Sequence, residues 1–137
     1  MHEITLKCRR ISKGRVEGEA MVTRQPMAFY GAVDEISGLV TDKNHELYGM
    51  SVTGKILVFA VAKGSAGGSY ALGKMVSHHA EPGGIINLRA DPILAVSAII
   101  ANVPMVVVSD KKDLDMIRSG DRIELDADNC LIKVQKS

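Results

Sequence analysis

The chain has 137 residues, of which 46% are hydrophobic and 24% are charged, and its net charge is +1. This length and composition are typical of one globular domain, here residues 1–137, that buries a core without disulfides or metals. The balanced charge and the absence of tryptophan argue against a nucleic-acid partner. The longest apolar run, residues 56–62, is far shorter than the about 20 residues that cross a membrane, and the polar start does not resemble a signal peptide. We therefore expect a cytoplasmic protein without a membrane or nucleic-acid partner.

The first third of the chain predicts two strands followed by a long irregular segment. Residues 3–9 alternate between apolar and polar side chains, as a half-buried strand does. Residues 16–22 predict a second strand, which follows a turn at Lys13-Gly14. Residues 25–54 contain several glycines and no clear helical pattern. An irregular segment of that length in a compact domain is often functional.

The middle of the chain alternates between predicted strands and helices. Residues 55–62 predict a buried central strand, and residues 70–79 predict a helix with one apolar face. A short strand is predicted over residues 85–88. Asp91-Pro92 then predicts the start of a second helix, with the aspartate as its N-cap and the proline in its first turn. Asn102 and the proline that follows end this helix.

The end of the chain returns to strands. Residues 105–108 predict a buried strand, and Asp110 predicts the start of a short helix that ends at Gly120. Residues 122–126 and 130–135 predict a closing hairpin. The whole order predicts a mixed α/β domain with β-rich ends.

The two cysteines, Cys8 and Cys130, lie in predicted strands at opposite ends of the chain. We interpret them as reduced structural residues of a cytosolic protein. An iron–sulfur cluster takes three or four thiolates, so this chain by itself is not expected to hold one.

The glycine-rich turn from Gly64 to Ser69 is the most informative feature of the sequence. It follows the predicted central strand and opens a helix, so unpaired backbone N–H groups and the helix dipole point at whatever lies above it. Two serines, Ser65 and Ser69, add hydroxyl groups. The turn predicts either an anion or substrate site or a tight strand–helix connection with Ser69 as N-cap.

Two other motifs do not support the function that they suggest at first. Residues 68–75 nearly match a phosphate-binding P-loop, but Met75 stands where a hydroxyl must contact magnesium, and the match lies mostly in the predicted helix. The adjacent histidines, His78 and His79, point about 100° apart on a helix and do not face one metal. No metal site is therefore predicted.

Acidic residues have no paired spacing that would indicate acid–base chemistry. Most are interpreted as solvated residues or caps, namely Glu17, Glu19, Asp42, Glu46 and Asp91. Asp34 is of more interest because it lies in the long irregular segment.

Several motifs, taken in order, resemble the small subunits of the aconitase X family. The resemblance extends from about Gly14 to Val134. The residues that carry it are Val16-Glu17-Gly18-Glu19-Ala20, Phe29-Tyr30-Gly31-Ala32-Val33-Asp34, Gly49-Met50-Ser51-Val52-Thr53-Gly54-Lys55, Lys63-Gly64-Ser65 with Gly68-Ser69, and Asp91-Pro92-Ile93-Leu94-Ala95.

The resemblance implies a swivelling β/β/α fold, as in the mobile domain of aconitase, and the activity of a hydro-lyase. Small subunits of this length resemble those of archaeal phosphomevalonate dehydratase. That enzyme converts (R)-5-phosphomevalonate to trans-anhydromevalonate 5-phosphate in a mevalonate pathway. A large catalytic subunit is the implied partner, and a [4Fe–4S]-type cluster is expected there.

The resemblance also implies roles for individual residues. Ser65 matches the serine that acts as proton acceptor in the aconitase swivelling domain. Gly64, Gly67, Gly68 and Ser69, together with Asp34, are the implied contacts of a small phosphorylated hydroxy acid. The N–H groups of Gly67 and Gly68 would stabilise the Ser65 alkoxide.

Two alternatives remain open. One is the small subunit of a cis-3-hydroxy-L-proline dehydratase. The other is a non-catalytic swivelling carrier or interaction domain, because residues 98–134 resemble phosphohistidine domains. Those domains need Thr-Ser-His where this chain has Asp91-Pro92-Ile93.

Overall fold

The computed structural model describes residues 2–29, 31–62 and 68–136. Eight strands and three helices lie in this part of the chain. In chain order they are β1 (His2–Lys7), β2 (Arg9–Ser12), β3 (Arg15–Val22), β4 (Ile56–Val58), α1 (Gly68–Ser77), β5 (Gly84–Asn87), α2 (Pro92–Ala101), β6 (Met105–Val107), α3 (Lys111–Asp115), β7 (Arg122–Asp126) and β8 (Leu131–Lys136).

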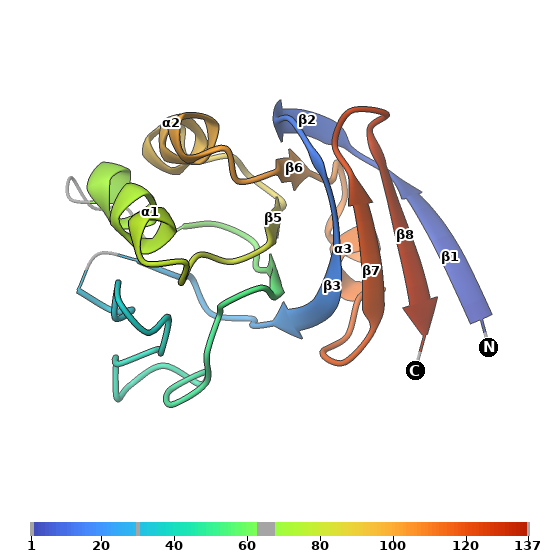
Figure 1. Ribbon diagram of the computed structural model, residues 1–137. Coiled ribbons are helices and arrows are strands. Elements are labelled where there is room, and N and C mark those ends of the chain that lie inside the picture. The colour runs from blue at the N-terminus through green and yellow to red at the C-terminus, as the bar shows by residue number, and fades with distance from the viewer. Residues whose placement is uncertain (1, 30, 63–67, 137) are drawn as a thin grey trace.

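All eight strands belong to one mixed sheet with the order β1-β8-β7-β3-β4-β5-β6-β2 (Figure 1). The half that contains β1, β8, β7 and β3 is antiparallel. The half that contains β3, β4, β5 and β6 is parallel, and β2 closes its edge in antiparallel orientation. The parallel half is built from β4-α1-β5-α2-β6, which agrees with the predicted strand–helix alternation. This mixed architecture is the α/β fold that the sequence predicts.

The sheet is strongly curled because its two edge strands are neighbours in the chain. β1 pairs with β8 and β2 pairs with β6, yet only Cys8 separates them. The prediction of one strand over residues 3–9 is therefore wrong in its bounds. The chain bends at Cys8 and its two halves pair with opposite edges of the sheet, which alternation alone does not reveal.

Two hydrophobic clusters occupy the two faces of the sheet. Neighbouring side chains on β5 point to opposite faces, so Ile85 joins one cluster and Ile86 joins the other. The first cluster includes α1 and α2, and the second includes α3 and the antiparallel strands. Figure 1 shows α1 and α2 on one side of the sheet, with the irregular segment next to α1.

Several element boundaries differ from the prediction. The central strand predicted over residues 55–62 is limited to β4, although Ala62 still forms a parallel bridge with Met27. The helix predicted over residues 70–79 begins at Gly68 and ends at Ser77, and His79 adopts a left-handed conformation with φ 56°. Tertiary pairing decides where such segments stop.

The end of the chain differs in two further places. α3 ends at Asp115 instead of continuing to Gly120. The hairpin is present, but Cys130 belongs to its turn, with φ 58°, and not to β8.

The irregular segment, residues 25–54, contains no helix among its described residues, as predicted. It is held by isolated bridges between Val33 and Val40 and between Leu39 and Ser51. Gly38 has φ +78°, and a Cβ there would lie 2.9 Å from the carbonyl oxygen of Ala80. A glycine is required here because the segment packs closely against the residues that follow α1.

In the described part of the chain, no helix is both long and apolar enough to cross a membrane.

Candidate active site

The carboxyl ends of the parallel strands form one closely bonded edge. The carbonyl oxygen of Ala60 accepts hydrogen bonds from the N–H groups of Leu88 and Arg89, at 2.9 and 3.0 Å. The N–H of Thr23 bonds the carbonyl oxygen of Val58 at 3.0 Å, and Met27 bridges to Ala62. The chain that follows β4 is thus held up to Ala62, immediately before the glycine-rich turn. Ligands of α/β sheets commonly bind at this kind of edge.

Both α1 and α2 begin at this edge because each follows a parallel strand. The Asp91 carboxylate accepts the N–H of Leu94 at 3.0 Å, so the predicted N-cap of α2 is confirmed. The N-terminal ends of both helices bring partial positive charge to this edge, which favours an anion.

The predicted catalytic residue lies outside the described part of the chain, and so do two of its neighbours. Gly64, Ser65 and Gly67 fall in residues 63–67. Gly68 and Ser69 are the first two residues of α1. Ser69 therefore lies in the first turn of the helix, and not at the N-cap position that one interpretation of the turn gave it.

Asp34 lies against the C-terminal half of α1, in an open cleft that it shares with Lys74 and His78. Its carboxylate accepts hydrogen bonds from the N–H of Ile36 at 3.0 Å and the hydroxyl of Ser37 at 2.9 Å. These two bonds lower the pKa of Asp34 below its ordinary value. The carboxylate is therefore ionised and already bonded within its own turn, and substrate binding by Asp34 stays a prediction.

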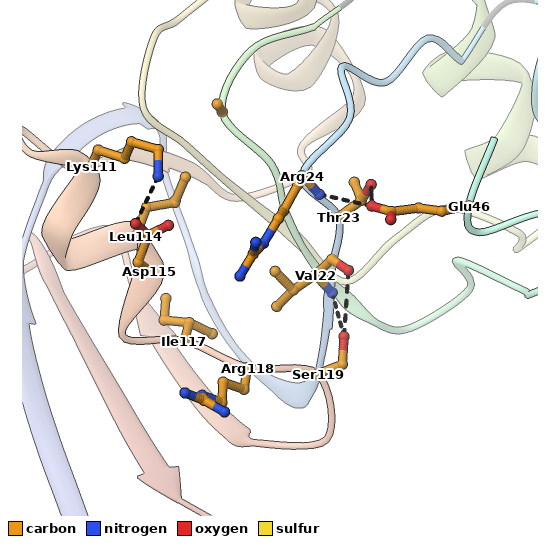
Figure 2. A pocket seen from close by; sticks show the side chains of 11 residues that line it. Val22, Thr23, Arg24, Glu46, Lys111, Leu114, Asp115, Ile117, Arg118 and Ser119 are labelled. Atoms are coloured by element: carbon orange, nitrogen blue, oxygen red, sulfur yellow. Dashed lines mark hydrogen bonds and ion pairs between the residues drawn. The ribbon is translucent and has the colours of Figure 1, made fainter.

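A second cavity, of about 450 Å³, opens beside the carboxyl end of β3 (Figure 2). Both apolar and charged side chains line it. Lys111 pairs with Asp115 at 2.8 Å, whereas the Arg24 and Arg118 guanidinium groups have no ion-pair partner among the residues that the structure describes. The sequence does not indicate this cavity, because residues from four separate segments form it, namely 22–24, 46, 60 and 111–119.

Glu46 is a structural residue that the sequence analysis missed. Its carboxylate accepts hydrogen bonds from the hydroxyl of Thr23 and from the N–H of Arg24, the latter at 2.8 Å (Figure 2). These bonds, the Thr23 hydroxyl first, lower the pKa of Glu46. Glu46 is exposed, as expected of a solvated residue, but its hydrogen bonds also tie the irregular segment to the end of β3.

Asn87 is a second missed residue at the same edge. It is fully buried at the end of β5, and its amide nitrogen donates to the carbonyl oxygen of Phe59 at 2.8 Å. Its amide oxygen accepts no hydrogen bond from the described residues. The only signal in the sequence is an asparagine within the apolar run Ile85-Ile86-Asn87-Leu88.

The cysteines of this chain do not suit an iron–sulfur cluster. They are neighbours in the fold, because the N–H of Cys8 donates to the carbonyl oxygen of Cys130 at 3.0 Å. The prediction that both lie in strands is wrong, since Cys8 separates β1 from β2 and Cys130 precedes β8. Burial, followed by the nearby Cys130 and Asp126, raises the pKa of the Cys8 thiol to about 12. A cluster needs three or four thiolates, and the chain has two cysteines.

The described residues also contain no group of three or more histidine, cysteine or acidic side chains placed to hold a metal ion. His78 and His79 both follow the end of α1, and the residues of the P-loop-like match, 68–75, are all helical.

The sequence profile of the aconitase X swivel domain matches residues 5–134. The chain belongs to the aconitase X swivel-domain family. It is 40% identical over 136 residues to the phosphomevalonate dehydratase small subunit of Methanosarcina acetivorans, and the match covers 99% of this chain and 94% of the relative. It is 43% identical over 122 residues to the subunit of the same name from Methanothrix thermoacetophila, covering 89% and 88% of the two chains.

The fold agrees with this family. A chain in the crystal structure of Thermococcus kodakaraensis aconitase X, in its holo form, superimposes with a TM-score of 0.90 at 38% identity. The match covers 97% of this chain and 99% of that one. The swivelling α/β fold implied by the sequence motifs is thereby confirmed, and the relatives' designation as small subunits implies a large catalytic partner.

Proposed function

We propose that this chain is the small subunit of a heteromeric hydro-lyase that dehydrates (R)-5-phosphomevalonate to trans-anhydromevalonate 5-phosphate. The observation that carries the proposal is the similarity, over nearly the full chain, to archaeal small subunits of phosphomevalonate dehydratase. The carboxyl edge with two helix N-termini adds a physical argument, because the substrate bears a carboxylate and a phosphate.

The reaction removes a proton from the carbon next to the carboxylate and hydroxide from the tertiary carbon beside it. In the proposal, Ser65 accepts the proton as a general base. A serine hydroxyl is a weak base in water, so its alkoxide needs stabilisation by nearby N–H groups, for which Gly67 and Gly68 are the candidates. Gly64, Ser69 and Asp34 complete the proposed substrate contacts.

The departing hydroxide needs a Lewis acid. A [4Fe–4S]-type cluster in the large subunit would supply it, since the two cysteines of this chain are too few to hold one. The proposed active site is therefore shared, with the carboxyl edge of this chain facing the partner and water excluded between them.

The test is reconstitution with the large subunit from the same organism under anaerobic conditions. We expect the complex to convert (R)-5-phosphomevalonate to the anhydro product, followed by phosphorus and proton NMR, and each subunit alone to be inactive. A cluster-loaded complex that leaves this substrate unchanged would contradict the proposal. Turnover of cis-3-hydroxy-L-proline in its place would favour the alternative dehydratase.

A further inference from the structure

The outer face of α2 carries a row of exposed aliphatic side chains. Ile93, Val96, Ile99 and Ile100 are 38%, 51%, 53% and 73% exposed. Their spacing places them on one side of the helix. Single exposed aliphatic residues are common on protein surfaces, but a contiguous group of four on one short helix indicates an interaction site. We call these four residues the α2 stripe.

The opposite side of the same helix is already buried. Leu94 and Ala98 pack in the first hydrophobic cluster, and the hydroxyl of Ser12 donates to the carbonyl oxygen of Ala98 at 3.2 Å. None of the ten residues of α2 is charged. By contrast, four of the five residues of α3 are charged. A helix that is apolar on all sides is typical of a buried position, so we expect the α2 stripe to be covered in the assembled protein.

The position of α2 favours the large subunit as the partner. The helix begins at the carboxyl edge described above and packs against α1, on the same side of the sheet (Figure 1). A protein that closes over this edge lies next to Ile93, at the start of the stripe. The exposed side of α2 therefore extends the surface that the proposed shared active site must present.

The α2 stripe alone is too small to form a complete interface with any partner. A helix of ten residues is about 15 Å long and, with its side chains, about 10 Å wide. A stable interface buries about 800 Å² on each partner, which is more than one such face supplies. The stripe is large enough to be one part of a wider interface, and the neighbouring carboxyl edge is the surface that would complete it.

We propose that the α2 stripe is a docking surface for the large subunit, an inference that rests on the proposed function. The matching surface of the large subunit must be apolar at its centre, because a charge buried against these side chains would lose its hydration without gaining a partner. Attraction between such surfaces depends on apolar burial, so the affinity should change little with salt concentration.

The experiment introduces charge into the α2 stripe and measures binding to the large subunit. The variants are Val96→Glu and the double variant Val96→Glu/Ile100→Glu. Both positions are exposed, so the folded chain should keep its thermal unfolding temperature. The control is Met116→Glu, at an exposed apolar residue that directly follows α3. Because α3 contributes Leu114 to the other hydrophobic cluster, this control lies away from the α2 stripe. Affinities come from calorimetry with the cluster-loaded large subunit, and the mass of this chain alone comes from light scattering.

We expect the double variant to bind the large subunit about 100-fold more weakly or worse, and Met116→Glu to bind like the unmodified chain. Equal binding by all variants, with an active unmodified complex, would overturn the docking surface and leave the proposed function intact. A dimer of this chain that the double variant dissociates, with binding to the large subunit unchanged, would identify a second copy as the occupant and overturn the inference. If the unmodified chain binds the large subunit and the double variant binds it more weakly, as expected, but the unmodified complex does not dehydrate the substrate, only the proposed function would be overturned.

Discussion

Ser65 is the residue on which the proposed chemistry depends most. If it is the proton acceptor, Ser65→Ala should lower kcat by about 10²- to 10⁴-fold, the usual contribution of a positioned acid–base group. KM and the affinity for the large subunit should change little, because only one hydroxyl is removed. Steady-state kinetics of the reconstituted complex, with its iron content checked, measure this effect.

A matched control for this variant is Ser77→Ala, at the other end of α1. The Ser77 hydroxyl is exposed and donates to the carbonyl oxygen of Lys74 at 2.7 Å, within the helix itself. Its removal should leave kcat unchanged. Turnover of Ser65→Ala at the rate of the unmodified complex would remove the base assignment.

Asn87 allows a test of polar burial at the carboxyl edge. In Asn87→Asp the Phe59 carbonyl oxygen loses its amide donor and faces a carboxylate in a fully buried position. At neutral pH we expect a loss of unfolding free energy larger than the about 1–3 kcal/mol typical of an unsatisfied neutral group, because the buried group here is charged. Urea unfolding measures it.

The pH dependence of that variant follows from the same burial. Burial raises the pKa of an aspartate, and a raised pKa makes the folded state relatively more stable at low pH, where the group is neutral. The difference between Asn87→Asp and the unmodified chain should therefore shrink as the pH falls from 7 toward 5. A difference that stays constant over this range would contradict the account.

Glu46 connects two elements, the end of β3 and the irregular segment, through its bonds to Thr23 and Arg24. These bonds lower its pKa, so the stability that they contribute is complete above the unfolded pKa and is lost as the pH falls through the folded value. We expect Glu46→Gln to reduce the loss of stability in acid, below about pH 4. Urea unfolding at pH 3, 4 and 7 compares the two proteins, and identical acid sensitivity would contradict this role.

Asp91 acts at the scale of one helix. Its carboxylate satisfies the N–H of Leu94 at the start of α2, so Asp91→Ala should lower the unfolding free energy by about 1 kcal/mol. Asp91→Asn keeps an acceptor oxygen at this place and should retain most of the stability. If both variants unfold at the same urea concentration, the hydrogen bond does not act as an N-cap.

The whole molecule should fold without a cluster of its own. We expect the isolated chain to be folded, colourless and without stoichiometric iron or sulfide, since its two cysteines are too few for the ligands of a cluster. Colorimetric iron and sulfide assays on the purified chain and on the complex test this. Iron bound in stoichiometric amount to the isolated chain would contradict it, whereas iron in the complex alone would agree with a cluster in the partner.

Local sequence signals determined several parts of this protein directly. Asp91 and Pro92 mark the start of α2, and the alternating residues 16–22 form most of β3, because capping and side-chain alternation depend on neighbouring residues only. Short motifs in a fixed order were also enough to indicate the aconitase X swivel domain, which the profile match and the fold agree with.

Pairing and packing between distant segments required the tertiary structure. The bend at Cys8 depends on which edges β1 and β2 meet, and the Glu46 carboxylate is bonded because β3 ends beside a segment more than twenty residues away. From the sequence, the exposed residues of α2 cannot be distinguished from its core residues, because the helix is apolar on all sides and the sequence does not determine which side the rest of the chain covers. The physical reason is the same in each case: these contacts depend on partners that chain order does not specify.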